Sequence, residues 1–193
     1  MILPIVAYGA PVLRKICKAI DADLPGLQKL MEDMWETMYN SKGVGLAAPQ
    51  VNHDIRLFMI DSKQIMENLE EEDKLDYPND EGYKGVFINA QVVSTQGDDW
   101  SYNEGCLSIP KLREDIFRQE EVNIDFMDEN FVMQRRLFNG ITARVILHEY
   151  DHIEGKLFID HLKPLKRKLL KRKLDDISKG KISVDYKMTF SKP

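Results

Sequence analysis

The segment with the clearest capacity for chemistry is His148-Glu149-Tyr150-Asp151-His152. Its two histidines are four positions apart, so on a helix both imidazoles project from one face and a single metal ion can bind both. Glu149 lies beside His152 on the same side of such a helix, where its carboxylate can serve as a general base next to the metal. The motif therefore predicts a catalytic metal centre.

A third protein ligand is needed, because a catalytic tetrahedral site takes three and leaves one position for water. One class of HExxH metallopeptidases takes a glutamate C-terminal to the motif, but no Glu follows Glu154. Another class takes a histidine six positions after the second motif histidine, and Phe158 holds that position here. Both classes are excluded, so the third ligand is expected upstream.

The best upstream candidate is Cys106, in the segment Glu104-Gly105-Cys106-Leu107-Ser108. Gly105 permits another backbone to approach closely, and the Leu107 N–H is aimed into the same space as the thiol. The leading hypothesis is one metal bound by Cys106, His148 and His152. The other candidates are assigned elsewhere: His161 to a surface or capping role, His53 to an exposed turn and Cys17 to the core.

The motif must be positioned by a helix whose inner face carries the histidines. Ile141, Val145, His148 and His152 are spaced four, three and four positions apart, which is one helical face. Asn139 is placed as the N-cap and Gly155 just past the end. Similar spacing of Leu27, Met31, Met34 and Met38 predicts a second, core-facing helix over 24–39.

Short runs rich in β-formers predict the strands that surround these helices. The expected strands are 55–60, 86–88, 92–95 and 122–126, with a hairpin through 128–130 into 131–138. Several strands and separated helices indicate an α+β domain. We expect antiparallel or mixed sheets around the central helix that carries HExxH, with one further helix near each end of the chain.

Composition limits the class of protein. The 193 residues carry 27 Lys+Arg against 32 Asp+Glu, and 43% are hydrophobic, which fits one soluble domain over 1–193. The net charge of −5 disfavours a general nucleic-acid-binding surface, and no apolar run reaches the length of a membrane span. Two distant cysteines and an N-terminus without secretory features favour the reducing cytoplasm, with no membrane association.

Two charged segments lie outside the chemistry. Residues 62–83 are rich in Asp and Glu and are expected to form an acidic surface insertion, part helix and part loop, with no function. Residues 163–178 predict a basic C-terminal helix, which Leu165, Leu169 and Leu170 dock on the domain. Its cations are either solvated or contact an anionic partner. The tail after Gly180 is either an edge strand or frayed.

Three segments together resemble the motifs of the peptide deformylases, in the order of that family. They are Gly43-Val44-Gly45-Leu46-Ala47-Ala48-Pro49-Gln50, Glu104-Gly105-Cys106-Leu107-Ser108 and His148-Glu149-Tyr150-Asp151-His152. The start, Tyr8-Gly9-Ala10-Pro11-Val12-Leu13-Arg14, is also similar, so the resemblance extends to about Leu165. It implies hydrolysis of the N-formyl group from the initiator Met of new polypeptides, with release of formate. It also implies one divalent metal, iron(II) first, with zinc, nickel or cobalt as alternatives.

The resemblance gives individual residues roles. Cys106, His148 and His152 bind the metal, Glu149 moves the proton, and Gln50 and the Leu107 N–H stabilise the developing oxyanion. The residues that contact substrate are Val44, Gly45, Gly105, Arg113, Ile141 and Val145.

Three further expectations concern the surroundings of these residues. Arg144 stands where relatives carry an apolar residue, and it is expected to swing outward. Glu104 and Arg118 are candidates for an ion pair. Asp151, one turn from His148, either supports the metal site or is a charge on the helix surface, and the second interpretation is preferred.

The resemblance also suggests partners. The implied substrates are formyl-Met nascent peptides, the basic helix over 163–178 is a candidate ribosome contact, and a monomer is expected. Two alternatives stay open at this point. One is an HExxH metallopeptidase, which shares the helix motif. The other is a binding module in which the metal has a structural role and the basic helix makes the functional contact.

Overall fold

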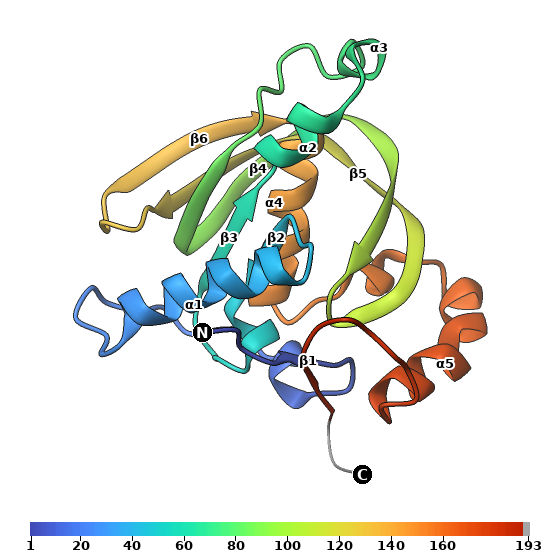
Figure 1. Ribbon diagram of the computed structural model, residues 1–193. Coiled ribbons are helices and arrows are strands. Elements are labelled where there is room, and N and C mark those ends of the chain that lie inside the picture. Colours follow the sequence, from blue (N-terminus) through green and yellow to red (C-terminus); the bar gives the residue numbers. More distant parts are fainter. Residues whose placement is uncertain (191–193) are drawn as a thin grey trace.

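A five-stranded antiparallel sheet curves around one buried helix in the computed structural model, which describes residues 1–190 (Figure 1). The strand order is β2-β3-β4-β5-β6. The strands are β2 (Gly45–Ala47), β3 (Leu57–Asp61), β4 (Lys84–Cys106), β5 (Ile109–Met127) and β6 (Met133–Asn139). The α+β class expected from the sequence is confirmed.

Strands β4 and β5 form one long hairpin, where the sequence predicted short separate strands. The pieces expected at 86–88 and 92–95 belong to a single 23-residue strand. Its register shifts between Ile88 and Gln91, between Val92 and Ser94, and again between Gln96 and Asp99. Such bulges bend a strand and increase its twist, so the hairpin can wrap around the helix. Bulges also interrupt the alternation of apolar and polar residues from which a strand is predicted, and the sequence therefore predicted short pieces.

The predicted hairpin between β5 and β6 is present. Asp128 holds its turn, because its Oδ1 accepts hydrogen bonds from the backbone N–H groups of Asn130 at 2.9 Å and Val132 at 3.0 Å.

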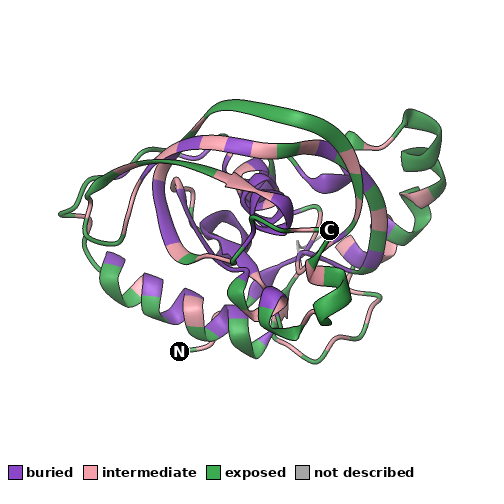
Figure 2. Ribbon diagram, turned by 90° about the horizontal axis from the view of Figure 1, so that it is seen from above, coloured by how far each residue is buried: buried purple, intermediate pink, exposed green. Residues whose placement is uncertain are grey.

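The central helix is α4 (Gly140–Ile153), and nearly all of its side chains are buried (Figure 2). Asn139 precedes it as expected, but its side chain makes no capping hydrogen bond. Asp80 from the acidic insertion takes that role instead. Its carboxylate accepts hydrogen bonds from the Thr142 N–H at 2.8 Å and the Thr142 hydroxyl at 2.5 Å. The insertion, predicted to lack a function, thus secures the first turn of the helix.

Helix α1 (Leu27–Asn40) covers the other face of the sheet. Alternate residues of β3 point to opposite faces, so Leu57 and Met59 pack with the methionines of α1, whereas Phe58 and Ile60 pack with α4. The predicted methionine stripe is confirmed as core: Met31, Met34 and Met38 are all buried. All of β3 is buried as well, because both of its faces are covered.

The remaining helices lie at the surface. The insertion forms α2 (Lys63–Asn68) and α3 (Glu71–Lys74), as part helix and part loop. The C-terminal helix is α5 (Pro164–Ser178). Of its three expected docking residues, Leu170 packs against a hydrophobic cluster, whereas Leu165 is 72% and Leu169 75% exposed. The buried docking residues are Leu174 and Ile177. Among residues 1–190, no helix is both long enough and apolar enough to cross a membrane.

The chain ends meet in a second, small sheet. Strand β1 (Ile5–Val6) pairs in parallel with β7 (Met188–Thr189). Of the two alternatives for the tail, the strand is therefore the one observed. Two 3₁₀ turns, Pro11–Arg14 and Phe158–His161, lie close to this end of the molecule, and a third, Ala48–Val51, follows β2.

Candidate metal centre and substrate cleft

Three predicted ligands converge from two elements. Cys106 ends β4, and His148 and His152 lie one turn apart on α4. Their ligand atoms all lie within 4.8 Å of one another, and the Cys106 Sγ is 3.3 Å from the His152 Nε2. One small cation placed among these atoms can contact all three.

The ionisation of Cys106 suits a cation. Burial raises the pKa of Cys106, but the imidazoles of His152 and His148 outweigh this and lower the pKa to about 5, so the thiolate that binds metals is the favoured form. The His148 Nδ1 is 2.9 Å from a Glu104 carboxylate oxygen, which leaves the Nε2 as its ligand atom. The buried His152 Nδ1 has no hydrogen-bond partner among the described residues. One thiolate and two imidazoles are a donor set that divalent transition metals accept.

A buried ionic network supports His148. The Glu104 carboxylate accepts hydrogen bonds from the Arg118 guanidinium at 2.8 and 3.1 Å, so this candidate ion pair is formed. Arg118 also donates to Asp151 at 2.7 Å, and the His161 Nε2 lies 2.7 Å from the same carboxylate oxygen. Burial raises the pKa of Glu104, but its hydrogen bonds to His148 and Arg118 outweigh this and hold the pKa well below its usual range.

Two expectations about this network were wrong. Asp151 is not a charge on the helix surface, because it is 7% exposed and bound to Arg118. Arg144 does not swing outward: it is 2% exposed and donates to Glu104 at 3.1 Å and to the Trp100 carbonyl at 2.8 Å. Its guanidinium carbon lies 4.5 Å from the centre of the Trp100 ring. Two guanidinium groups therefore balance two carboxylates in the interior.

Glu149 lies beside the predicted ligands without joining the network. It is 4% exposed, and its Oε2 has no hydrogen-bond partner among the described residues. Burial raises the pKa of Glu149 to about 7, so the carboxyl can both take and give a proton near neutral pH. A side chain at Gly45 would place its Cβ only 2.5 Å from the Glu149 Oε1, so glycine is required beside this carboxylate.

Gln50 and Leu107 lie around the thiol. The Gln50 Nε2 is 3.5 Å from the Cys106 Sγ and 3.4 Å from the Ser108 Oγ, while its Oε1 accepts from the Ala47 N–H at 2.8 Å. That last bond fixes the amide with its NH₂ group toward the centre. Leu107 follows Cys106 directly, and its carbonyl accepts a hydrogen bond from the Tyr186 hydroxyl at 2.7 Å.

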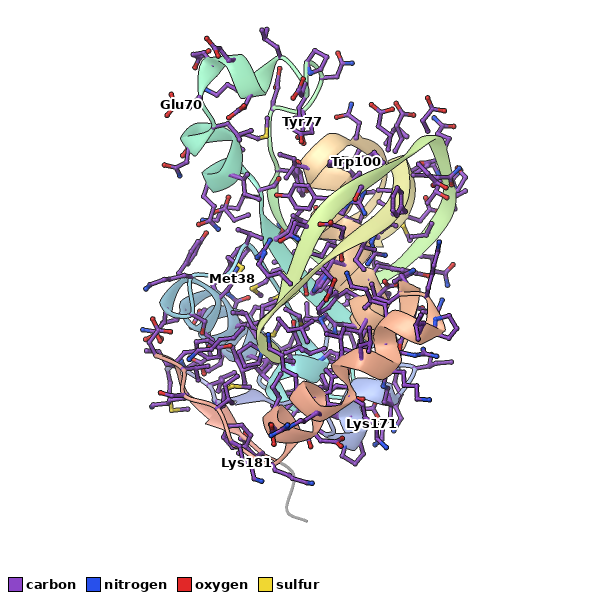
Figure 3. The ribbon with its side chains drawn as sticks, turned by 90° about the vertical axis from the view of Figure 1, so that its right-hand side faces the viewer. Met38, Glu70, Tyr77, Trp100, Lys171 and Lys181 are labelled. Atoms are coloured by element: carbon purple, nitrogen blue, oxygen red, sulfur yellow. The ribbon has the colours of Figure 1, made fainter. Side chains whose placement is uncertain are left out.

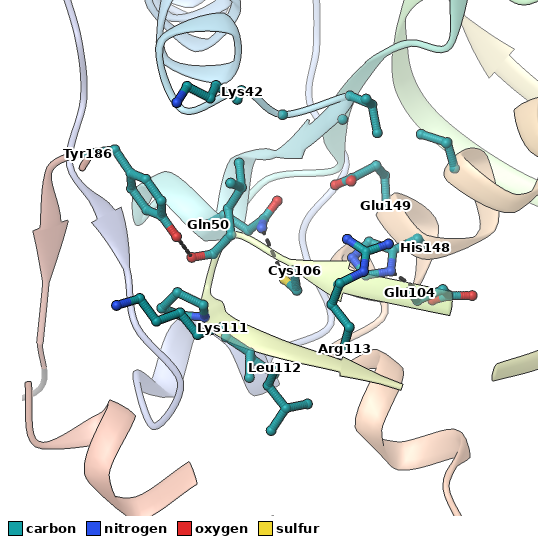
Figure 4. A pocket seen from close by; sticks show the side chains of 18 of the residues that line it. Lys42, Gln50, Glu104, Cys106, Lys111, Leu112, Arg113, His148, Glu149 and Tyr186 are labelled. Atoms are coloured by element: carbon teal, nitrogen blue, oxygen red, sulfur yellow. Dashed lines mark hydrogen bonds and ion pairs between the residues drawn. The ribbon is translucent and has the colours of Figure 1, made fainter. Parts of the chain in front are cut away.

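A cavity of about 870 Å³ opens in front of these groups (Figure 4). It is large enough for a peptide segment and not only for one side chain. Five of the predicted substrate-binding residues line it: Val44, Gly45, Gly105, Arg113 and Val145. The sixth, Ile141, lies in the hydrophobic core one turn before Val145, and the cavity lining described for residues 1–190 does not include it.

Sequence reasoning missed part of the cavity wall. Ile65 from α2, Tyr102 from β4 and the C-terminal segment Ser183–Tyr186 also line it. No spacing in the sequence signals these contacts, because each residue is brought to the cavity by the fold and not by a motif. Only the apolar and aromatic residues within a polar tail hinted that the tail packs on something.

Comparisons with known proteins agree with this geometry. The model of the family described as polypeptide deformylase matches residues 2–168. A peptide deformylase of Christiangramia forsetii is 53% identical over 190 residues, covering 98% of this chain and 96% of the relative. One of Flavobacterium johnsoniae is 50% identical and covers 99% and 97%.

Solved structures are also similar. A peptide deformylase crystal structure from Legionella pneumophila superposes with a TM-score of 0.77 at 35% identity, covering 94% of this chain and 98% of that one. The structure from Thermus thermophilus gives 0.78 at 32% identity, with 93% and 99% covered.

Proposed function

The chain belongs to the polypeptide deformylase family, and from this membership we propose which of its residues carry out the family's reaction. The protein is a metal-dependent hydrolase that removes the N-formyl group from the initiator methionine of new polypeptides and releases formate. The alternative of an HExxH metallopeptidase is not favoured, because these relatives match nearly the whole chain. The observation that carries the assignment of residues is the convergence of Cys106, His148 and His152 beside Glu149.

Cys106, His148 and His152 hold one divalent ion in this proposal. Iron(II) is the proposed resident ion, and zinc(II), nickel(II) and cobalt(II) suit the same donors. Such an ion supplies a Lewis acid, which acidifies water toward a pKa of about 7 and polarises the formyl carbonyl. The lowered pKa of Cys106 and the Glu104 contact that orients His148 support this assignment.

Glu149 moves the proton. Its carboxylate takes a proton from the water that attacks the formyl carbon, and it then returns the proton to the amine nitrogen of the departing methionine. Burial and the pKa of about 7 support both halves of this role, because the group changes protonation at little cost near neutral pH.

Gln50 and Leu107 stabilise the oxygen of the formyl group as it gains negative charge. The Gln50 Nε2 and the Leu107 N–H are the proposed donors, and the hydrogen bond from the Ala47 N–H to the Gln50 Oε1 fixes the amide orientation. Loss of one such donor typically costs about 2.7 to 4 kcal/mol of transition-state stabilisation.

The substrate lies along the cleft as an added strand. Gly45 and Gly105 allow its backbone to come close on both sides, and Arg113 lies near that backbone. The methionine side chain points toward Val44 and Val145, with Ile141 behind this wall in the core.

The cellular setting is also proposed. Residues 1–193 act as one catalytic domain and as a monomer in the cytoplasm, where nascent chains emerge. The basic helix α5 contacts the ribosome, and its exposed Leu165 and Leu169, set among lysines and arginines, support an intermolecular contact.

The decisive test is formate release from formyl-Met-Ala-Ser. The protein is purified without oxygen and loaded with iron(II) or nickel(II), beside a Glu149→Ala variant that is checked for fold and metal content. We expect release by the parent and loss of at least two orders of magnitude in the variant. A folded, metal-loaded parent that releases no formate would overturn the proposal.

A further inference from the structure

The C-terminal segment Ser183–Tyr186 lines the same cavity as the metal ligands, although it lies beyond the family match over residues 2–168. It follows α5 and crosses to the side of the cleft away from α4, where Figure 4 shows Tyr186 and Lys42 near each other. This wall of the cleft is thus built from a part of the chain that none of the three motifs includes.

Three contacts hold this segment in place. The Tyr186 hydroxyl donates to the Leu107 carbonyl at 2.7 Å, which ties the segment to the turn beside Cys106. The Tyr186 ring packs against the hydrophobic cluster that contains the α1 methionines. Just beyond it, β7 pairs with β1. The segment is therefore a fixed wall and not a loose end.

The direction of the cleft brings the substrate to this wall. Strand β2 is an edge strand, so its outer edge is open to a peptide. Gly45 lies against Glu149, and two positions earlier Gly43 lies against Leu107 and Met38. A peptide whose formyl group is beside Glu149 and whose backbone follows this edge continues toward Lys42. The residues after the formyl-methionine then face Ser183–Tyr186.

The charges at this end of the cleft are unequal. The Asp185 carboxylate lies 3.2 Å from the Lys42 Nζ, and Lys111 on the opposite wall adds a second positive charge near it. Both charges, and the Lys42 hydrogen bond above all, hold the pKa of Asp185 below its usual value, so the group is ionised at neutral pH. One carboxylate therefore faces two ammonium groups here.

We propose that Ser183–Tyr186 form the wall that receives the substrate residues following the formyl-methionine, and that Asp185 sets which charges are accepted there. This inference rests on the deformylase function. With two lysines against one aspartate, the wall favours an acidic residue in the nascent chain, and Asp185 moderates that preference enough for basic residues to pass.

The test compares kcat/KM for formyl-Met peptides with amidated C-termini that carry Asp, Ala or Lys at the second, third or fourth position. The enzymes are the parent, Asp185→Asn, Lys42→Gln and the control Asp176→Asn. Asp176 is an acid on α5 that pairs with Lys181 and lies outside the cleft lining. The side chains of Asp185 and Lys42 are 74% and 82% exposed, so both substitutions leave the fold intact.

Asp185→Asn is expected to raise the ratio of kcat/KM for the Asp peptide over the Lys peptide about 2- to 5-fold at one or more positions, through KM. Lys42→Gln lowers the same ratio, Asp176→Asn leaves it unchanged, and both shifts shrink at high salt. A ratio that is the same in the parent and Asp185→Asn at all three positions overturns the role of the wall, while cleavage of the Ala peptides still supports the deformylase function. If the metal-loaded parent cleaves none of the peptides, the deformylase function itself has failed.

Discussion

Glu149 is the residue on which the proposed chemistry depends most directly. Burial of its carboxylate is normally unfavourable, and the Glu149 Oε2 has no compensating partner among the described residues. Burial also raises the pKa of Glu149 to about 7, and a carboxyl with this pKa readily takes and gives a proton near neutral pH. The unfavourable burial of Glu149 should therefore lower the stability of the metal-free protein.

Replacing Glu149 with Gln is expected to stabilise the metal-free protein in a pH-dependent way. The pKa of Glu149 is about 7 when folded and about 4.3 when unfolded, so the native state binds the proton more tightly and the stability of the parent falls as pH rises between these values. Gln does not titrate. Its advantage should grow over this window to at most about 4 kcal/mol and stay level above pH ~7.

Urea unfolding of both proteins at a series of pH values from about 5 to 8 measures this difference. Curves that stay parallel across that range would contradict the buried, high-pKa state of Glu149. The Gln variant should also lose deformylation, which separates its gain in stability from its loss of function.

Glu104 is the residue that contacts His148, a proposed metal ligand. Glu104→Gln keeps the shape but removes the charge that faces His148, Arg118 and Arg144. We expect the affinity for zinc(II) to fall about 10- to 100-fold, as measured by competition with a chelator. Glu120→Gln, an exposed position on the neighbouring strand β5, serves as the matched control. Equal affinity in the two variants would show that His148 needs no such support.

Single residues of the site were predictable to the extent that their partners lie within one motif. His148, Glu149 and His152 follow from helical spacing alone, and Cys106 follows from its flanking glycine and backbone N–H. Asp151 and Arg144 could not be placed, because their partners Arg118, Glu104 and Trp100 are brought to α4 only when β4 and β5 curl around it. A charged residue in a helical sequence looks solvated until its partners are known.

At the scale of elements, α4 depends on a cap from a distant segment. Asp80 lies 62 positions before Thr142, so no local signal connects it to the helix, whereas Asn139 stands at the expected position and makes no side-chain cap. Helices α1 and α4 were predictable because their buried faces repeat with helical spacing. The extent of β4 was not, since bulges and exposed positions interrupt its alternation.

Removal of the Asp80 carboxylate tests this cap. Asp80→Ala should lower the free energy of unfolding by about 1 to 2 kcal/mol, because the Thr142 N–H loses its acceptor and the Thr142 hydroxyl keeps only Ser62 as a partner. Asp76→Ala, an exposed acid of the same insertion, should change stability by less than ~0.5 kcal/mol. Chemical denaturation measures the free energy of unfolding of the two variants. If Asp80→Ala is as stable as its control, the insertion does not stabilise α4.

At the scale of the whole molecule, opposite charges are segregated. Figure 3 shows Lys171 on the basic helix α5 and Glu70 in the acidic insertion at opposite ends of the molecule. The net charge of −5 gives no sign of this separation, because it is a sum over the whole chain. A polyanionic surface would attract the α5 end and repel the other, and so orient the molecule as it approaches.

Reversal of charge on α5 is expected to weaken ribosome binding. The double variant Lys168→Glu/Arg172→Glu should cosediment with ribosomes several-fold less than the parent at about 50 mM salt, and the difference should shrink near 200 mM. Lys63→Glu/Lys74→Glu, which reverses two cations in α2 and α3 of the acidic insertion and so changes the net charge by the same amount, is the control. Equal loss in both variants would mean that total charge, and not α5, governs binding. Deformylation of short peptides should be the same in all three proteins.

The pairing of β1 with β7 has a consequence for the order in which this enzyme is made. Ile5 and Val6 are synthesised before the large sheet and α4, whereas their strand partners, Met188 and Thr189, are synthesised after them. The Tyr186 contact to Leu107 is equally late. An enzyme that acts on other proteins at the start of their synthesis thus completes its own cleft only after α5 has been made, and a partly translated copy carries the proposed metal ligands without the wall that faces them.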